Sequence, residues 1–295
     1  MWGLPQKQNA RRADKIRLCG HLRRYKKIVK KTYIILDKIL NVENGKTKEF
    51  FQKNCYRYLN LGYWEIDLDL FYKEFSLESD FCIDGITIYH ITTRLEDTMK
   101  ENFVIDNLET ALLSENSLTK FLKDCQIEFN KKEDGIDVFY NGEKCQFKGP
   151  ENARLRNRLC KLNDSCVNGF LFNENMDYMY IGLIGMPEIF SDLMNSLGRE
   201  DLKQEYFKRR KSYEVTINVP INDLIFDDDS QIQNCSEKTK LILKYVINYL
   251  CYKISKDKYY CFNNPIIRLP DNKNVDNEYI HAIRCIKDAK EIFKC

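Results

Sequence analysis

The dipeptide Asn141-Gly142 stands between two short runs of strand-forming residues, at 136–140 and 143–147. A type I′ turn needs two successive residues with positive φ, and Asn followed by Gly is among the pairs that adopt this conformation most readily. The pattern therefore predicts a β-hairpin. Because a hairpin joins antiparallel strands, we expect the chain to contain an antiparallel sheet.

Other strand and helix patterns lie on both sides of this hairpin. Alternating β-branched and aromatic residues predict strands at 86–92, 178–184, 213–220, 259–262, 266–269 and 278–286. Helical spacing and helix-end residues predict helices at 107–122, 187–198 and 236–254. The polar, Arg-rich segment 149–165 predicts a loop. This order of elements indicates an α+β fold with a mixed, mainly antiparallel sheet.

The N-terminal part of the chain has a helical pattern. Seven apolar residues recur at steps of three and four, namely Leu18, Leu22, Tyr25, Val29, Tyr33, Leu36 and Leu40. Apolar residues at this spacing share one face of a helix, so we expect a helix at about 13–41 and a second one at 47–59. The sequence thus predicts a helical, basic N-terminal region, 1–80, followed by a second domain, 81–295.

Basic residues concentrate in the segment 11–31, which holds ten Lys or Arg and one Asp. Its net charge is +9, and the rest of the chain sums to −6 because the whole carries +3. Such a helix binds nucleic-acid phosphates in some proteins and anionic membranes in others. The membrane interpretation is disfavoured, since no Trp or Phe lies on the apolar stripe. The third interpretation is a helix that packs on its own protein and balances the acidic remainder.

Cysteines and hydropathy restrict the setting of the protein. The chain has 12 Cys, but no two form a C-x-x-C pair and none clusters with His, so we expect no metal site. No run of 18 apolar residues is present, and no apolar h-region follows the first residues, so we expect no membrane segment and no signal peptide. We therefore expect a cytoplasmic protein with no membrane partner, in which most Cys are small buried apolar residues.

Common catalytic motifs, such as a Gly-rich phosphate loop or a nucleophile elbow, are absent from the sequence. The chain has three His, of which His90 lies within the predicted strand 86–92. Taken alone, His90 is typical of a half-buried strand histidine. Glu278 at the start of the last predicted strand is, taken alone, typical of a solvated acid.

Three segments considered together resemble a known enzyme family. They are Tyr89-His90-Ile91-Thr92-Thr93, the strand and loop from Tyr213 to Asp227, and Asn277-Glu278-Tyr279-Ile280. They are similar to strands of the ADP-ribosyltransferases of the His-Tyr-Glu type, which include diphtheria-toxin-like and PARP-like enzymes. The resemblance covers about residues 81–295 through short motifs, and it implies a split β-sandwich.

The resemblance also implies a reaction and a set of residues for it. NAD would be the substrate, its bond between nicotinamide and ribose would break, and ADP-ribose would pass to a macromolecular acceptor, a protein or a nucleic acid. Glu278 would stabilise the positive charge on the ribose. His90 and Thr92 would bind NAD, and Tyr178 or Tyr180 would stack on the nicotinamide ring. Transfer to water, and a role as toxin, effector or housekeeping enzyme, remain open.

Two further features bear on function. Arg154, Arg156 and Arg158 would share one side of an extended segment, where they would clamp a diphosphate or an acidic substrate; a solvated loop is the plainer interpretation. The alternative function is that of a non-enzymatic nucleic-acid-binding protein that uses the basic helix 11–31.

Overall fold

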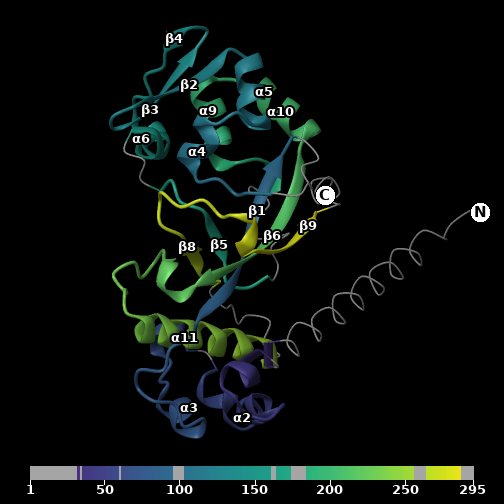
Figure 1. Ribbon diagram of the computed structural model, residues 1–295, viewed down its shortest axis with the longest axis vertical. Helices are drawn as coiled ribbons and strands as arrows, with labels where there is room; N and C mark the ends of the chain where they lie inside the picture. Colours follow the sequence, from purple (N-terminus) through teal and green to yellow (C-terminus); the bar gives the residue numbers. More distant parts are fainter. Residues whose placement is uncertain are drawn as a thin grey trace, which may run out of the picture. The chain divides into compact units, whose positions relative to one another are not determined.

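The computed structural model of the chain (Figure 1) describes residues 32–33, 35–59, 61–95, 103–160, 164–173, 184–255 and 264–286. The chain divides into two compact units. The first comprises Met1–Ile83 and Ser236–Asn263, and the second comprises Asp84–Cys235 and Asn264–Cys295. The predicted basic helix 11–31 and the predicted strand 259–262 lie outside the described residues.

The first unit consists of helices. Its elements are the helical residues 32–33 and 35–39, α2 (Lys46–Asn54), η1 (Cys55–Arg57), η2 (Tyr63–Glu65), α3 (Asp69–Glu74) and most of α11 (Cys235–Ile254). Aromatic rings form its core, with the Phe50 ring centroid 5.3 Å from that of Phe51 and 5.4 Å from that of Phe71. Such rings bury much apolar surface and favour edge-to-face contacts, so they hold α2 against α3.

Helix α11 joins this unit although the sequence placed residues 236–254 in the second domain. The Tyr245 ring stacks on Tyr63 with centroids 4.1 Å apart, and the Asn248 side-chain amide donates to the Leu61 carbonyl at 3.0 Å. Buried residues such as Ile242, Leu243 and Leu250 face more than one side of α11, so the helix needs cover from several neighbours. A sequence pattern shows this need, but not which part of the chain meets it.

A six-stranded antiparallel sheet forms the centre of the second unit, in the order β7-β8-β5-β1-β6-β9 (Figure 1). The strands are β1 (Gly85–Arg94), β5 (Asn168–Phe170), β6 (Lys211–Pro220), β7 (Ile225–Phe226), β8 (Ile266–Arg268) and β9 (Ile280–Cys285). β1 and β6 pair over their whole length, from Gly85 opposite Pro220 to Arg94 opposite Lys211. The expected α+β fold with an antiparallel sheet is confirmed.

A second, smaller sheet packs with helices around a separate core of the same unit. Its strands are β2 (Ile127–Lys132), β3 (Gly135–Tyr140) and β4 (Glu143–Lys144), and its helices are α4 (Leu108–Leu113), α5 (Ser117–Asp124), α6 (Ala153–Cys160), α9 (Glu188–Leu197) and α10 (Glu200–Arg209). The predicted hairpin is confirmed: Tyr140 pairs with Glu143, and φ is 53° at Asn141 and 80° at Gly142.

Two predictions for this part of the chain were wrong in detail. The segment 149–165, predicted as a loop, contains α6, because Leu155 and Leu159 stand four residues apart and are both buried. The predicted helix 107–122 is interrupted by Asn116, whose side chain accepts hydrogen bonds from the amides of Leu118 and Thr119 and so begins a new helix.

Cysteine chemistry also differs from expectation at two positions. Cys82 takes part in a disulfide bond, and so does Cys235, whereas seven other cysteines of the described chain are free thiols. The sequence spacing of the cysteines gave no sign of this. Within the described ranges, no helix has the length and apolarity needed to cross a bilayer, and no group of three His, Cys, Asp or Glu is arranged to hold a metal ion.

Candidate functional site

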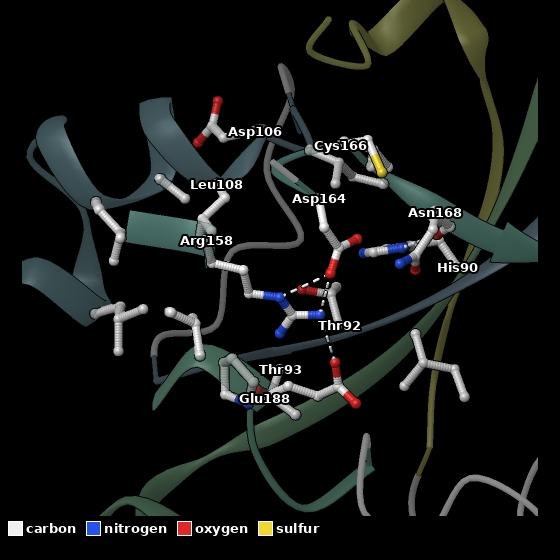
Figure 2. Close-up of a pocket in the computed structure, with 18 of the residues that line it drawn as sticks. His90, Thr92, Thr93, Asp106, Leu108, Arg158, Asp164, Cys166, Asn168 and Glu188 are labelled. Carbon is white, nitrogen blue, oxygen red and sulfur yellow. Dashed lines mark hydrogen bonds and ion pairs between the residues drawn. The ribbon is translucent and has the colours of Figure 1, made fainter. Parts of the chain in front are cut away.

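A pocket of about 370 Å³ opens in the second unit beside the end of β1 (Figure 2). Its wall includes residues 90–94 of β1, Asn168 of β5, Arg158 of α6, Glu188 of α9 and Arg268 of β8. β1 and β5 are paired only where Tyr89 lies opposite Phe170, so the residues of β1 that follow are not covered by β5. Small-molecule sites in proteins have volumes in this range.

Gly169 allows the two strands to come close at this point. A Cβ atom on Gly169 would lie 3.0 Å from the carbonyl oxygen of Tyr89, which is tighter than normal packing allows. The absence of a side chain thus lets β5 approach β1 and brings Asn168 next to His90.

The His90 ring is held in one tautomer. Its Nδ1 atom lies 2.6 Å from the backbone carbonyl oxygen of Asn168. Because a carbonyl oxygen only accepts hydrogen bonds, Nδ1 carries the proton and Nε2 has a free lone pair. No other residue of the described chain is hydrogen-bonded to the ring. His90 therefore offers the pocket an acceptor.

Burial keeps this histidine neutral. Desolvation lowers the pKa of His90 to about 4, the hydrogen bond to Asn168 opposes that shift, and the charge of Arg94 adds to it. At neutral pH the ring is therefore an uncharged acceptor, which suits a hydroxyl group of a ligand. Thr92 also lines the pocket, two residues along the same face of β1.

Arg158 forms a second fixed group in the wall. Its Nε and Nη2 atoms donate to Asp164 Oδ2 at 2.8 and 2.7 Å, and Nη2 also donates to Glu188 Oε2 at 2.9 Å. Figure 2 shows the guanidinium between the two carboxylates. Only 12% of the Arg158 side chain is exposed, against 40% for Asp164 and 42% for Glu188, so the guanidinium is the buried member of the network. Asp164 and Glu188 thus already neutralise the positive charge of Arg158.

The three predicted arginines do not share one side. Because α6 is a helix, residues two apart point in different directions. Arg154 Nε donates to Asp192 at 2.7 Å, and Arg156 Nη1 donates to the carbonyls of Phe147 and Gly149. Of the three, only Arg158 lines the pocket. The predicted diphosphate clamp of Arg154 and Arg156 is thus not formed.

Glu278 is not brought to the pocket. It lies in the short helix η5 (Asn277–Tyr279), which precedes β9, and it is exposed. In the sheet β6 lies between β1 and β9, so the strand of His90 and the strand that follows Glu278 are not neighbours. Tyr178 and Tyr180 lie outside the described residues.

Several pocket residues were not singled out from the sequence. Asn168 and Asp164 come from short or irregular segments, whereas Glu188 is the first residue of α9; the role of all three depends on tertiary contacts. Cys166 also lines the pocket, and desolvation raises the pKa of its thiol to about 11, so it is not activated as a nucleophile at neutral pH. A positive φ of 61° at Asp164 is the one local peculiarity among them.

Comparison with known proteins adds no relative. No family model matches the chain, and neither a search of curated proteins nor a search of solved structures found a match.

Proposed function

We propose that this pocket binds NAD and that the protein transfers ADP-ribose from NAD to a macromolecular acceptor. The observation that carries the proposal is the neutral His90, which lines a pocket of suitable size and has Nδ1 bonded to Asn168, so that Nε2 is left as an acceptor. Ribose hydroxyls are the donors that such a lone pair accepts, and the Thr92 hydroxyl adds a second polar group on the same face.

The chemistry requires a carboxylate near the reacting ribose, because positive charge develops there as nicotinamide leaves. Glu188 is a carboxylate of the pocket wall, while Glu278 lies outside the wall. The proposal therefore rests on NAD binding at His90. A comparison of nicotinamide release by Glu188→Gln and Glu278→Gln identifies the carboxylate that acts on the ribose.

Two measurements test the proposal. NAD should raise the unfolding temperature of the wild type, since a ligand that binds the folded state stabilises it, and it should raise that of His90→Ala less. Nicotinamide release should be measurable with a cell lysate as the source of acceptors. No stabilisation by NAD, together with no nicotinamide release, rejects the proposal.

A second candidate, nucleic-acid binding, is favoured by the charge of the two units. The first unit contains 23 Lys and Arg against 12 Asp and Glu, and most of the excess lies in residues 11–31. Binding through phosphates would weaken steeply as salt rises. A deletion of residues 11–31 should then abolish salt-dependent binding to a duplex of arbitrary sequence, and unchanged binding argues against this candidate.

A further inference from the structure

Arg94 is the last residue of β1 and lines the pocket together with His90 and Thr92. The three residues are spaced two apart, so they occupy the same face of the strand. At about 3.3 Å per residue, the Cα atoms of His90 and Arg94 are about 13 Å apart. The pocket thus has a hydroxyl acceptor at one end of this row and a guanidinium at the other.

The guanidinium of Arg94 is incompletely partnered. Its Nη2 atom donates to the Val104 carbonyl at 3.1 Å, and its central carbon lies 5.4 Å from the centre of the Phe103 ring. Its Nε atom is buried and has no hydrogen-bond partner among the described residues. Buried donors without a partner are uncommon in folded proteins.

Arg94 also lacks a paired carboxylate, unlike the other arginines of the pocket. Arg158 is paired with Asp164 and Glu188, and Arg268 is paired with Asp227 at 3.2 Å. No ion pair joins Arg94 to an acid in the part of the chain that the structure describes. Asp106 lies in the same wall, but burial raises its pKa despite the charge of Arg94.

A half-buried guanidinium with no bound carboxylate is costly unless an anion completes it. Its planar fork of donors matches the oxygen atoms of a phosphate group, and hydrogen bonds between charged partners are the stronger kind. A ligand phosphate would therefore pair with the charge that the described residues leave without a carboxylate.

We propose that Arg94 binds the diphosphate of the nucleotide ligand while His90 binds a ribose hydroxyl. This inference rests on the proposed function, because in NAD the diphosphate joins the two riboses. The separation along β1 fits that order, since the long Arg94 side chain can reach part of the way toward His90.

Binding of inorganic pyrophosphate, ADP and adenosine tests the inference by calorimetry on the full chain. Pyrophosphate and ADP should bind the wild type and should bind Arg94→Gln about tenfold more weakly or worse, which is the scale of losing a charged hydrogen bond. Arg94→Lys should be intermediate, since it keeps the charge and loses the fork. Adenosine should bind wild type and Arg94→Gln equally.

The control is Arg209→Gln, an equal change of charge in the same unit. Its side chain is 53% exposed, is paired with Glu205 and does not line the pocket, so pyrophosphate affinity should not change. Without ligand, Arg94→Gln should unfold at the wild-type temperature or above. A drop in that temperature with unchanged pyrophosphate affinity would mean that Arg94 only packs on Phe103.

The result separates this inference from the proposed function. Pyrophosphate binding that depends on Arg94, in a protein that releases no nicotinamide from NAD, supports the anion site and refutes the transferase. Failure of the wild type to bind pyrophosphate, or equal affinity in wild type and Arg94→Gln, overturns the anion site even where NAD is cleaved. If Arg94→Gln does not fold, the same comparison is made with Arg94→Lys.

Discussion

The side-chain oxygens of Thr93 and Tyr206 lie 2.8 Å apart and join β1 to α10. Thr93 is 6% exposed and Tyr206 is 1% exposed, so the hydrogen bond is shielded from water. This buried hydrogen bond connects the six-stranded sheet to α10, one of the helices that pack with the three-stranded sheet. Removing one hydroxyl leaves the other buried without a partner.

We predict that Thr93→Val and Tyr206→Phe each lower the free energy of unfolding by about 1–2 kcal/mol. The double variant should lose less stability than the sum of the two single variants, because only the first substitution leaves a buried hydroxyl without its partner. Thr87→Val on the same strand is the control, since the Thr87 hydroxyl bonds to an exposed Asn218. Urea unfolding followed by circular dichroism measures all four variants, and simple additivity would show that the two hydroxyls do not interact.

The first unit depends on a buried acid in a similar way. The Asp37 carboxylate accepts hydrogen bonds from the amides of Gly45 and Thr47, at 2.7 and 2.9 Å, and from the Thr47 hydroxyl at 2.7 Å. These donors lie at the start of α2, where amides have no partner within the helix. Gly45 has a φ of 99°, which few other residues adopt.

We therefore predict that Asp37→Ala destabilises the first unit by about 2–3 kcal/mol, as expected when a helix cap and a buried hydrogen-bond cluster are lost together. Asp80→Ala removes an exposed acid of the same unit and should change stability by less than about 0.5 kcal/mol. Urea unfolding followed by circular dichroism, which reports the helices of this unit, measures the transition. Equal effects of the two substitutions would contradict the capping role.

Sequence patterns predicted the strands and helices whose signals are local. The hairpin at Asn141-Gly142 needs two positive φ values, and helix α9 ends at Gly198 with a φ of 66°, so both followed from residue type alone. Strand β5 has three residues and α6 has a mixed polar surface, so neither has a clear period. The grouping of α11 with the N-terminal helices depends on long-range contacts that no local pattern encodes.

The site was predicted only in part for the same reason. His90 and Thr92 lie in the pocket because they belong to a regular strand whose alternation is readable. Arg158 pairs with acids that stand 6 and 30 residues away in sequence, so its role appears only in the folded chain. Glu278 was placed by motif, and the motif does not determine which strand lies between β1 and β9.

His90 should leave a mark on the pH dependence of stability. The pKa of His90 in the folded protein is about 4, below the ordinary histidine value of 6.5, because burial disfavours the charged ring. As pH falls below 6.5, His90 becomes protonated in the unfolded chain but stays neutral in the folded chain. The free energy of unfolding therefore decreases with falling pH until the folded-state pKa of about 4 is reached. Relative to His90→Gln, the wild type should lose at most about 3 kcal/mol between pH 6.5 and 4. Parallel unfolding profiles for the two proteins would mean that His90 titrates normally.

Two arginines of α6 provide a matched pair for measuring how much the burial of an ion-paired arginine contributes to stability. Arg158 is 12% exposed and bridges two acids, whereas Arg154 is 55% exposed and also contacts two acids, Asp192 and Glu188. Arg158→Gln should cost about 1–3 kcal/mol, since it removes a largely buried guanidinium together with its hydrogen bonds to Asp164 and Glu188. Arg154→Gln should cost less than about 1 kcal/mol, the usual value for exposed pairs. Thermal unfolding of the two variants measures both losses, and a larger loss in Arg154→Gln than in Arg158→Gln would refute the argument.

Glu278→Gln decides between two opposed expectations. The resemblance predicts that nicotinamide release falls by about two to three orders of magnitude, the scale seen when one preorganised electrostatic group is removed. The structure shows an exposed side chain outside the pocket wall, and a substitution at such a position should change stability by less than about 0.5 kcal/mol with no kinetic effect. We predict unchanged stability and a rate of nicotinamide release within about twofold of wild type.

His90→Ala should instead weaken apparent NAD affinity as well as turnover, because it removes a group that orients the substrate. A rate that collapses in Glu278→Gln while folding is intact would show that Glu278 reaches the reacting ribose, and the pocket beside His90 would then extend to η5.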